Sequence, residues 1–171
     1  REMQVRPVKL GSRALLLELA DFFQRQPVAA GRRLVVAPES EDVLFCADRD
    51  LLYRVMANLT RNALEATAPG ESVTLSCGVA PGGVFYRVHN PGVMPESVRL
   101  QLFTRFFSTK GSGRGLGTYC ARLLAEEYLG GRLLVRSQAE VGTEFSMILP
   151  KERQDLGASP ALALTPPANA G

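Results

Sequence analysis

The stretch that most limits how this chain can fold runs from residue 48 to residue 67. Its apolar residues recur at helical spacing for about five turns, at roughly 3.6 residues per turn. They are Leu52, Val55, Met56, Leu59, Ala63 and Ala66. Asp48 is a preferred type of helix N-cap, and Pro69-Gly70 ends the helix after about Thr67. A helix with so long an apolar stripe must bury it against another layer of the fold.

Two asparagines lie beside this stripe, with Glu65 and Arg54 continuing the same rim. Asn58 and Asn62 are four residues apart, so their side chains lie roughly 6 Å apart on one side of the helix. Amide oxygens are hard, neutral ligands of the kind that Mg²⁺ accepts while it also binds waters and phosphates. The pair therefore indicates a magnesium and phosphate site. The alternative interpretation is two ordinary solvent-exposed asparagines.

Shorter periodic segments surround the long helix. Helices are predicted over residues 12–24, from Pro95 to about Phe103, and over residues 118–129. Strands are predicted over residues 34–36, 43–46, 72–78, 84–89, 132–137 and 143–149. This order predicts an α/β fold, a two-layer sandwich in which helices cover one face of a mixed β-sheet.

The chain of 171 residues is long enough for one domain with a real core, which we place at residues 1–150. From residue 151 to residue 171 the composition shifts to alanine, proline, leucine and serine. We interpret that segment as a tail or linker without a fold of its own.

A glycine-rich stretch precedes the helix predicted from Thr118. Its glycines are Gly111, Gly113, Gly115 and Gly117, and Lys110 and Arg114 add positive charge. Glycines let backbone amides approach a phosphate closely, and a helix N-terminus favours an anion. The stretch lacks the Gly-Lys-Ser/Thr ending of a P-loop, and no strand leads directly into it as in a Rossmann motif. It indicates either a phosphate-binding lid or a flexible surface loop.

One polar residue continues the inward-facing side of a predicted strand. Val84, Tyr86 and Val88 share a face, and Asn90 falls in phase with them before Pro91-Gly92 turns the chain. An amide oxygen at that strand end could accept a hydrogen bond from the exocyclic amine of adenine. The alternative is that Asn-Pro-Gly is simply favourable turn chemistry.

Composition excludes several other function classes. The net charge of +3 is scattered, without a basic helix or an aromatic-interleaved basic stripe, so no nucleic-acid partner is expected. No apolar run reaches the roughly 18 residues of a membrane span, so no membrane contact by this fragment is expected. The three cysteines have neither zinc-ligand nor disulfide-framework spacing, which favours the cytoplasm.

Over about residues 10–150, these segments together resemble the catalytic domain of sensor histidine kinases. That family lies within the GHKL ATPase superfamily, which includes gyrase, heat-shock chaperones and mismatch-repair proteins. Residues 58–66 look like the asparagine box, 90–92 like the first glycine box and 103–110 like the phenylalanine box. Residues 113–117 look like the second glycine box and 142–145 like the closing Gly-Thr-x-Phe. The resemblance implies a Bergerat-type ATP-binding fold.

The resemblance also implies ATP and Mg²⁺ as cofactors and gives roles to single residues. Asn62 would ligate Mg²⁺ and Asn58 would position the ion or a water, which makes these two the catalytic residues. Asn90 would read adenine with support from Thr143. The remaining nucleotide-binding positions implied are Glu65, Gly92, Met94, Phe103, Phe107, Lys110, Gly113, Arg114, Gly115, Leu116, Gly117 and Thr118.

Two positions depart from related patterns. Gyrase-like ATPases carry a catalytic glutamate where this chain has Asn58, and the absence of that carboxylate favours phosphoryl transfer to a protein over hydrolysis. The family's first glycine box begins with aspartate, where this chain has Asn90. Two alternatives remain open: a serine kinase of the anti-sigma type, and a nucleotide-dead docking module.

His89 is the only histidine, and it lies at a predicted strand end rather than on a long amphipathic helix. We therefore interpret it as a structural or pocket-edge residue. The expected partners are a histidine-bearing dimerisation domain of the same kinase, which this chain lacks, and a response regulator. The chain alone is expected to bind ATP without phosphorylating itself.

Overall fold

The helix predicted from the apolar stripe lies at the centre of the structure, a computed structural model that describes residues 3–104 and 116–152. This helix, α2, spans Arg49–Glu65. The Asp48 carboxylate caps it by accepting the backbone N–H of Leu51 at 3.1 Å. The helix ends two residues earlier than predicted, and the N–H of Ala66 closes the last turn on the carbonyl of Asn62 at 3.1 Å.

More of α2 is buried than the predicted stripe. Val55 and Met56 are fully buried, as expected, but so are Thr60 and Leu64, whereas Ala66 is exposed. The reason is that α2 has neighbours on three sides, because it packs on the sheet and between two other helices. These are α1, Ser12–Gln24, and α4, Leu116–Leu123.

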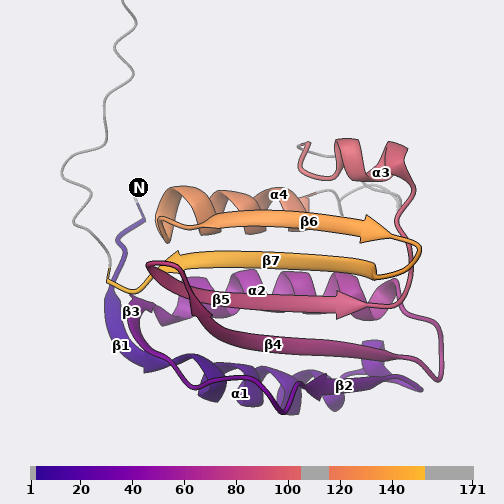
Figure 1. Ribbon diagram of the computed structural model, residues 1–171, viewed down its shortest axis with the longest axis horizontal. Helices are drawn as coiled ribbons and strands as arrows, with labels where there is room; N and C mark the ends of the chain where they lie inside the picture. The colour runs from indigo at the N-terminus through magenta and orange to yellow at the C-terminus, as the bar shows by residue number, and fades with distance from the viewer. Residues whose placement is uncertain (1–2, 105–115, 153–171) are drawn as a thin grey trace, which may run out of the picture.

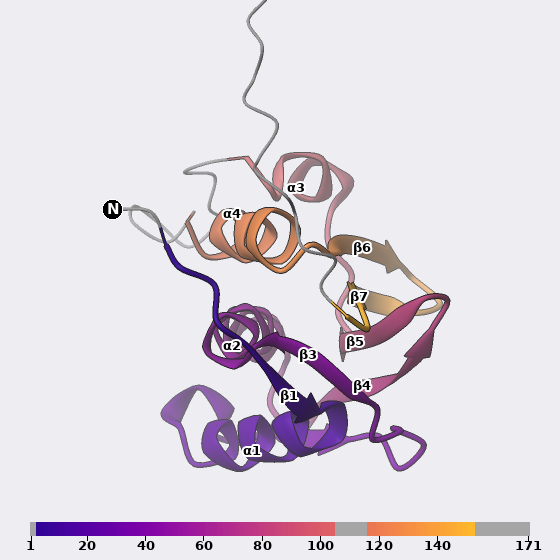
Figure 2. The same cartoon turned by 90° about the vertical axis from the view of Figure 1, so that its left-hand side faces the viewer.

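The main sheet has five strands in the order β2-β4-β5-β7-β6. They are β2 Arg33–Val36, β4 Ser72–Ala80, β5 Gly83–Asn90, β7 Gly142–Pro150 and β6 Arg132–Gln138. β2 pairs parallel with β4 and the other pairs are antiparallel, so the sheet is mixed, as predicted. α2 and α4 lie behind the strands in Figure 1, and Figure 2 shows α1, α2 and α4 along one side of the sheet.

The predicted strand at residues 43–46 does not join the five-stranded sheet. It forms β3, Leu44–Asp48, which pairs antiparallel with β1, Pro7–Gly11, in a separate two-stranded sheet. β1 is not predicted from the sequence, because its five residues, PVKLG, are exposed or half-buried and show no regular alternation. Only pairing with β3 makes this segment a strand.

The remaining helices are short. A 3₁₀ turn covers Pro27–Ala29, and α3 covers only Glu96–Gln101 of the predicted 95–103. α4 continues into one π-helical turn, Leu124–Tyr128, where the N–H of Leu129 donates to the carbonyl of Leu124 at 2.9 Å. The helix therefore stops near the predicted residue 129 but with a wider last turn.

The end of the domain returns to the two-stranded sheet. After β7, the carbonyl of Lys151 accepts the backbone N–H of Cys46 at 3.0 Å. Residues 153–171 lie outside the described residues, so the division into a domain of residues 1–150 and a tail remains a prediction. Within the described ranges, no helix is long and apolar enough to cross a membrane.

Candidate functional site

The asparagines predicted as a metal and phosphate site lie on the C-terminal half of α2. Asn58, Asn62 and Glu65 are all half-buried, at the border between the packed face of the helix and the solvent. Their side chains are therefore held by a rigid element and remain partly exposed to solvent. The predicted i, i+4 placement of the two amides is present in the helix.

Asn90 ends β5 on the inward face of the sheet, in phase with the buried Tyr86 and Val88. Only 3% of its surface is exposed. Among the described residues, its side-chain carboxamide has no hydrogen-bond partner. Among the described residues, the hydroxyl oxygen of Thr60 is the one side-chain polar atom that is both fully enclosed and without a partner. The carboxamide of Asn90 also has no partner, so its atoms are not fully enclosed in the core. The carboxamide therefore stays accessible in a residue that is otherwise buried.

The turn after β5 meets the end of α2. A Cβ added at Gly92 would lie 3.3 Å from the carbonyl oxygen of Ala66 and 3.3 Å from Nδ2 of Asn90. Ala66 is one helical turn beyond Asn62, to whose carbonyl its N–H is bonded. The close approach allowed by glycine thus brings the amide of Asn90 and the asparagines of α2 to one end of the molecule.

Two hydroxyl groups fix the conformation of this turn. Ser137 Oγ, at the end of β6, accepts the backbone N–H of Met94 at 2.7 Å. Thr143 Oγ1, on β7, donates to the carbonyl of Gly92 at 2.7 Å. The two hydroxyl oxygens are 2.9 Å apart, and because the only hydrogen of Thr143 is already donated, Ser137 is the donor between them. Both hydroxyl hydrogens are therefore committed within the protein.

The β6–β7 turn also presses against Asn90. Gly142 has φ +84°, and a Cβ at this position would lie 2.4 Å from the carbonyl oxygen of Asn90. Glycine is required there both for its positive φ and for the space. This contact and the Asn90–Thr143 pairing hold the end of β5 in place.

The described residues before and after the glycine-rich stretch contact each other. The hydroxyl of Thr118, in the first turns of α4, donates to the carbonyl of Leu102 at 2.8 Å. The guanidinium of Arg122 lies 4.8 Å from the ring centroid of Phe103. These contacts place Phe103 and Thr118 together, with Leu116 and Gly117 at the start of the same helix.

Several predicted residues lie outside the described ranges. They are Phe107, Lys110, Gly111, Gly113, Arg114 and Gly115. Their assignment to a phosphate-binding lid remains a prediction.

His89 has the structural role that the sequence analysis gave it. It is the neighbour of Asn90 but points to the opposite face of β5, where its Nε2 donates to the carbonyl of Val141 in the β6–β7 turn. It therefore supports the same turn as Gly142, from the other side of the sheet.

Ser137, which holds the turn after β5 through Met94, is not among the predicted site residues. A signal for it was present, because Ser137 falls in phase with the inward-facing Leu133 and Val135 at the end of a strand, as Asn90 does on β5. The part played by Gly142 could not be recognised from sequence, since its contact with Asn90 spans 52 residues of chain.

The donor chemistry of this end of the molecule fits a magnesium ion held partly by a ligand. The described residues contain no group of three or more histidine, cysteine, aspartate or glutamate side chains that could hold a metal. Asn58 and Asn62 offer neutral amide oxygens, which suit Mg²⁺ when phosphates and waters supply the other ligands.

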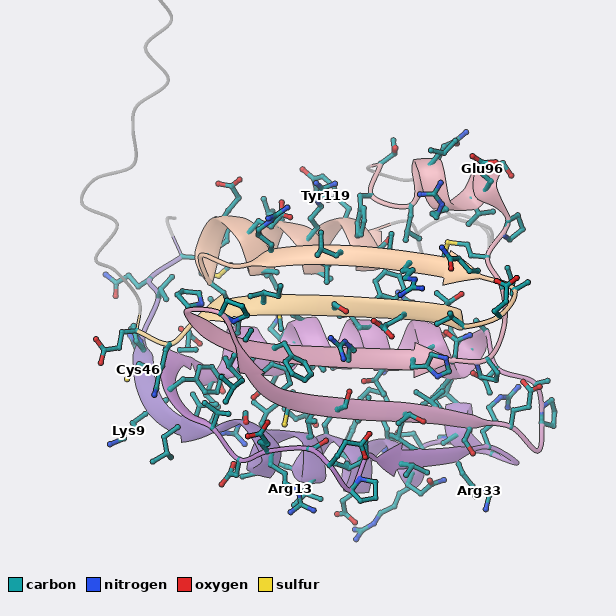
Figure 3. All side chains as sticks on the ribbon, in the orientation of Figure 1. Lys9, Arg13, Arg33, Cys46, Glu96 and Tyr119 are labelled. Carbon is teal, nitrogen blue, oxygen red and sulfur yellow. The ribbon has the colours of Figure 1, made fainter. Side chains whose placement is uncertain are left out.

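A hollow lies at the other end of α2 from the asparagines, near the N-terminus of the helix. It has a volume of about 230 Å³ and is lined by Glu18, Arg49, Asp50, Tyr53 and Arg54. The side chains of Arg49 and Glu18 form an ion pair there. The predicted site residues lie elsewhere, and Figure 3 shows Glu96 of α3 at the far end of the molecule from Lys9 and Cys46 of the two-stranded sheet.

A family model described as histidine kinase-, DNA gyrase B-, and HSP90-like ATPase matches residues 47–153. Sporulation kinase C of Bacillus subtilis is 32% identical to this chain over 114 residues, covering 66% of this chain and 26% of that protein. Sensor protein SrrB of Staphylococcus aureus is 32% identical over 112 residues, covering 61% of this chain and 19% of that protein. The match thus spans about a quarter or less of each relative's length.

Solved histidine kinase structures have the same fold. The nucleotide-free catalytic domain of ThkA matches with a TM-score of 0.74 and 25% identity, covering 88% of this chain and 97% of that one. Full-length ShkA in complex with AMPPNP matches with a TM-score of 0.72 and 28% identity, over 88% of this chain and 32% of that one. ThkA in complex with the response regulator TrrA matches with a TM-score of 0.73 and 24% identity, over 86% of this chain and 42% of that one.

Proposed function

Because this chain belongs to the family of histidine kinase-, DNA gyrase B- and HSP90-like ATPases, we propose that it is the ATP-binding catalytic domain of a two-component sensor histidine kinase. In this proposal it transfers the γ-phosphate of ATP to a histidine on a separate dimerisation domain. The similar histidine kinases, and the AMPPNP bound to ShkA, support ATP as the phosphoryl donor.

The observation that carries the proposal is the contact between the turn after β5 and the end of α2. It sets the unpaired carboxamide of Asn90 beside the helix that carries Asn58 and Asn62. A purine would then be read at Asn90 while its phosphates extend along α2 toward Thr118 of α4. Glu65, Gly92, Met94 and Thr143 border the same space in this proposal.

Asn62 would hold Mg²⁺ together with the phosphates, and Asn58 would orient the ion or a water. When bound, the ion would neutralise part of the negative charge of the triphosphate. The amide side chains, fixed on a packed helix, would hold the triphosphate in one orientation. Because residue 58 carries no carboxylate to activate water, the proposed reaction is transfer to a histidine rather than hydrolysis.

The partners we propose are a histidine-bearing dimerisation domain of the same kinase and a response regulator, as in the complex of ThkA with TrrA. We also propose a cytoplasmic location, where ATP is available. The similar proteins are histidine kinases rather than anti-sigma-type serine kinases. A docking module without nucleotide binding would fail the following experiment.

The first test is calorimetric titration of the purified chain with a non-hydrolysable ATP analogue, with and without Mg²⁺. We expect Mg²⁺-dependent binding with a Kd between micromolar and millimolar. No heat, together with no thermal shift, would reject the nucleotide-binding function.

The Asn62→Ala variant tests the metal assignment. We expect it to abolish the Mg²⁺-dependent part of the affinity, because the proposed protein ligand is removed. Arg61→Ala is the matched control on the same helix, since the Arg61 guanidinium lies 5.8 Å from the Phe23 ring centroid, on the α1 side. Unchanged Mg²⁺-ATP affinity in Asn62→Ala would refute the assignment.

A transfer assay tests the reaction itself. The chain is incubated with labelled Mg-ATP, alone and with the separately purified dimerisation domain of its own kinase. We expect label only on the dimerisation domain, because His89 is engaged by the carbonyl of Val141 within the sheet. Label on the chain alone, or on a serine, would contradict the proposed reaction.

A further inference from the structure

The carboxamide of Asn90 differs from the neighbouring polar groups that fix the turn after β5. The hydroxyls of Ser137 and Thr143 and the N–H of Met94 all have partners within the protein. The carboxamide has none among the described residues, although the residue is only 3% exposed. A polar group on the packed face of a sheet must have a partner, a water or a ligand, so a ligand that pairs with this carboxamide takes the place of water there.

Nothing in the described part of the protein selects one orientation of this amide. A side chain at residue 92 would crowd its Nδ2, but residue 92 is a glycine. A half-turn about the last side-chain bond exchanges the donor NH₂ and the acceptor oxygen within the same volume. Asn90 can therefore present either arrangement to a ligand.

The neighbouring hydroxyl of Thr143 cannot act as either donor or acceptor in the way that Asn90 can. The hydrogen of Thr143 is bonded to the carbonyl of Gly92, and the hydrogen of Ser137 is bonded to Thr143. Thr143 therefore has only a lone pair to offer a ligand. The donor or acceptor character of this corner is set by Asn90 alone among these three residues.

The two orientations match two kinds of purine. Adenine offers a donor at its 6-amino group and an acceptor at N1, whereas a 6-oxopurine offers an acceptor at O6 and a donor at N1. A carboxamide complements either edge after a half-turn. An ionised carboxylate only accepts, so it would repel O6 when the purine lies in the same orientation.

We propose that Asn90 makes the base site of this domain permissive, so that it accepts 6-oxopurine triphosphates as well as ATP. This inference rests on the proposed function, since it assumes that the base lies against Asn90. It assigns the choice of phosphoryl donor to one residue.

The decisive measurement compares Mg-ATP with Mg-inosine triphosphate on the unmodified chain. These two nucleotides differ only at position 6 and the N1 proton, so the comparison excludes effects of the 2-amino group of guanine. We expect their Kd values to agree within about tenfold, which is 1.4 kcal/mol. Inosine triphosphate binding more than 100-fold weaker than ATP would overturn the proposal.

The variant Asn90→Asp then tests which residue is responsible. Measured at pH 8, where the new carboxyl is ionised, it should raise the preference for ATP over inosine triphosphate by at least tenfold. An unchanged ratio would overturn the proposal, provided that a thermal melt shows the variant to be folded. If it does not fold, the ratio for the unmodified chain decides by itself.

Inorganic triphosphate separates this inference from the proposed function. If no nucleotide and no triphosphate bind in the presence of Mg²⁺, the proposed function fails and the inference fails with it. If ATP and triphosphate bind but inosine triphosphate does not, the proposed function stands and only the permissive base site is rejected.

Discussion

Thr60 and Thr67 are two buried threonines of the α2 region that differ in one respect. Thr67 is 2% exposed, and its hydroxyl donates to the carbonyl of Ala63 at 2.6 Å. Thr60 is fully buried, and its hydroxyl has no partner in the described part of the chain. The Thr60 hydroxyl should therefore lower the free energy of unfolding, whereas the Thr67 hydroxyl should raise it.

We predict that Thr60→Val stabilises the domain by about 1 kcal/mol, because it removes an unpaired buried hydroxyl with almost no change in shape. Thr67→Val, the matched control, should destabilise it by about 1 kcal/mol, because a formed hydrogen bond is lost. Urea unfolding followed by circular dichroism measures both. Equal destabilisation by the two substitutions would show that the Thr60 hydroxyl is satisfied in solution.

Single polar residues in phase with an apolar strand are the most informative part of this sequence. The alternation along β5 marks Asn90 as such a residue, and Ser137 obeys the same rule on β6. The rule has a physical basis, since a polar group on the packed face of a sheet must have a partner, a water or a ligand.

At the scale of elements, the β6–β7 turn acts as a support for the end of β5. Gly142 and Gly70 both have positive φ, +84° and +89°, but their surroundings differ. A Cβ at Gly70 would meet no atom within 4 Å, whereas one at Gly142 would lie 2.4 Å from the carbonyl oxygen of Asn90. Substituting Gly70 therefore tests the strain of a positive φ alone, whereas substituting Gly142 tests that strain together with a close contact.

We predict that Gly70→Ala costs about 1 kcal/mol of stability through its positive φ alone. Gly142→Ala should cost a further ~1–3 kcal/mol from the contact with Asn90. It should also weaken binding of the ATP analogue, whereas Gly70→Ala should leave the affinity unchanged. Thermal melts and calorimetric titration of the two variants test this prediction. Equal affinities of the two variants for the ATP analogue would show that the β6–β7 turn does not contribute to the site.

At the scale of the whole molecule, the core contains two weak acids that folding keeps protonated. Cys77, on β4, is 2% exposed, and burial raises the pKa of its thiol. Tyr86, on β5, is 1% exposed, and burial raises the pKa of its phenol well above the ordinary range. Its hydroxyl donates to the carbonyl of Ser12 at 3.1 Å, at the start of α1.

These pKa shifts make the stability of the domain fall at alkaline pH. Below the unfolded thiol pKa of about 8.5, both states hold the proton and Cys77 adds no pH dependence. Above it the unfolded state loses the proton first, so the free energy of unfolding falls by up to about 1.4 kcal/mol per pH unit. Tyr86 adds a second decline above about pH 10.

Urea titrations between pH 7 and pH 10 test this prediction. Cys77→Ala should flatten the decline between pH 8.5 and pH 10, although it lowers the stability at every pH. Cys46→Ala, at a half-buried thiol, is the control for the loss of one thiol from the chain. If the free energy of unfolding of Cys77→Ala declines just as steeply with pH, the decline comes from another group.

The sequence by itself determined the elements whose residues repeat along the chain. The periods of 3.6 and 2 predicted α1, α2 and the two hairpins nearly at their observed bounds, because side-chain burial follows those periods within one element. The same patterns placed Asn62 on the rim of a helix and Asn90 at the end of a core strand. The family followed from the order of five short motifs, which the match over residues 47–153 confirms.

The tertiary structure alone decided what depends on pairing between distant segments. β1 is a strand only because it meets β3, and Thr60 is buried only because α2 has neighbours on three sides. The hydroxyl pair that fixes the turn joins residues 43 and 51 positions apart in the chain, Met94 with Ser137 and Gly92 with Thr143. Contacts of that kind leave no period in the sequence, since each depends on a residue that only folding brings near.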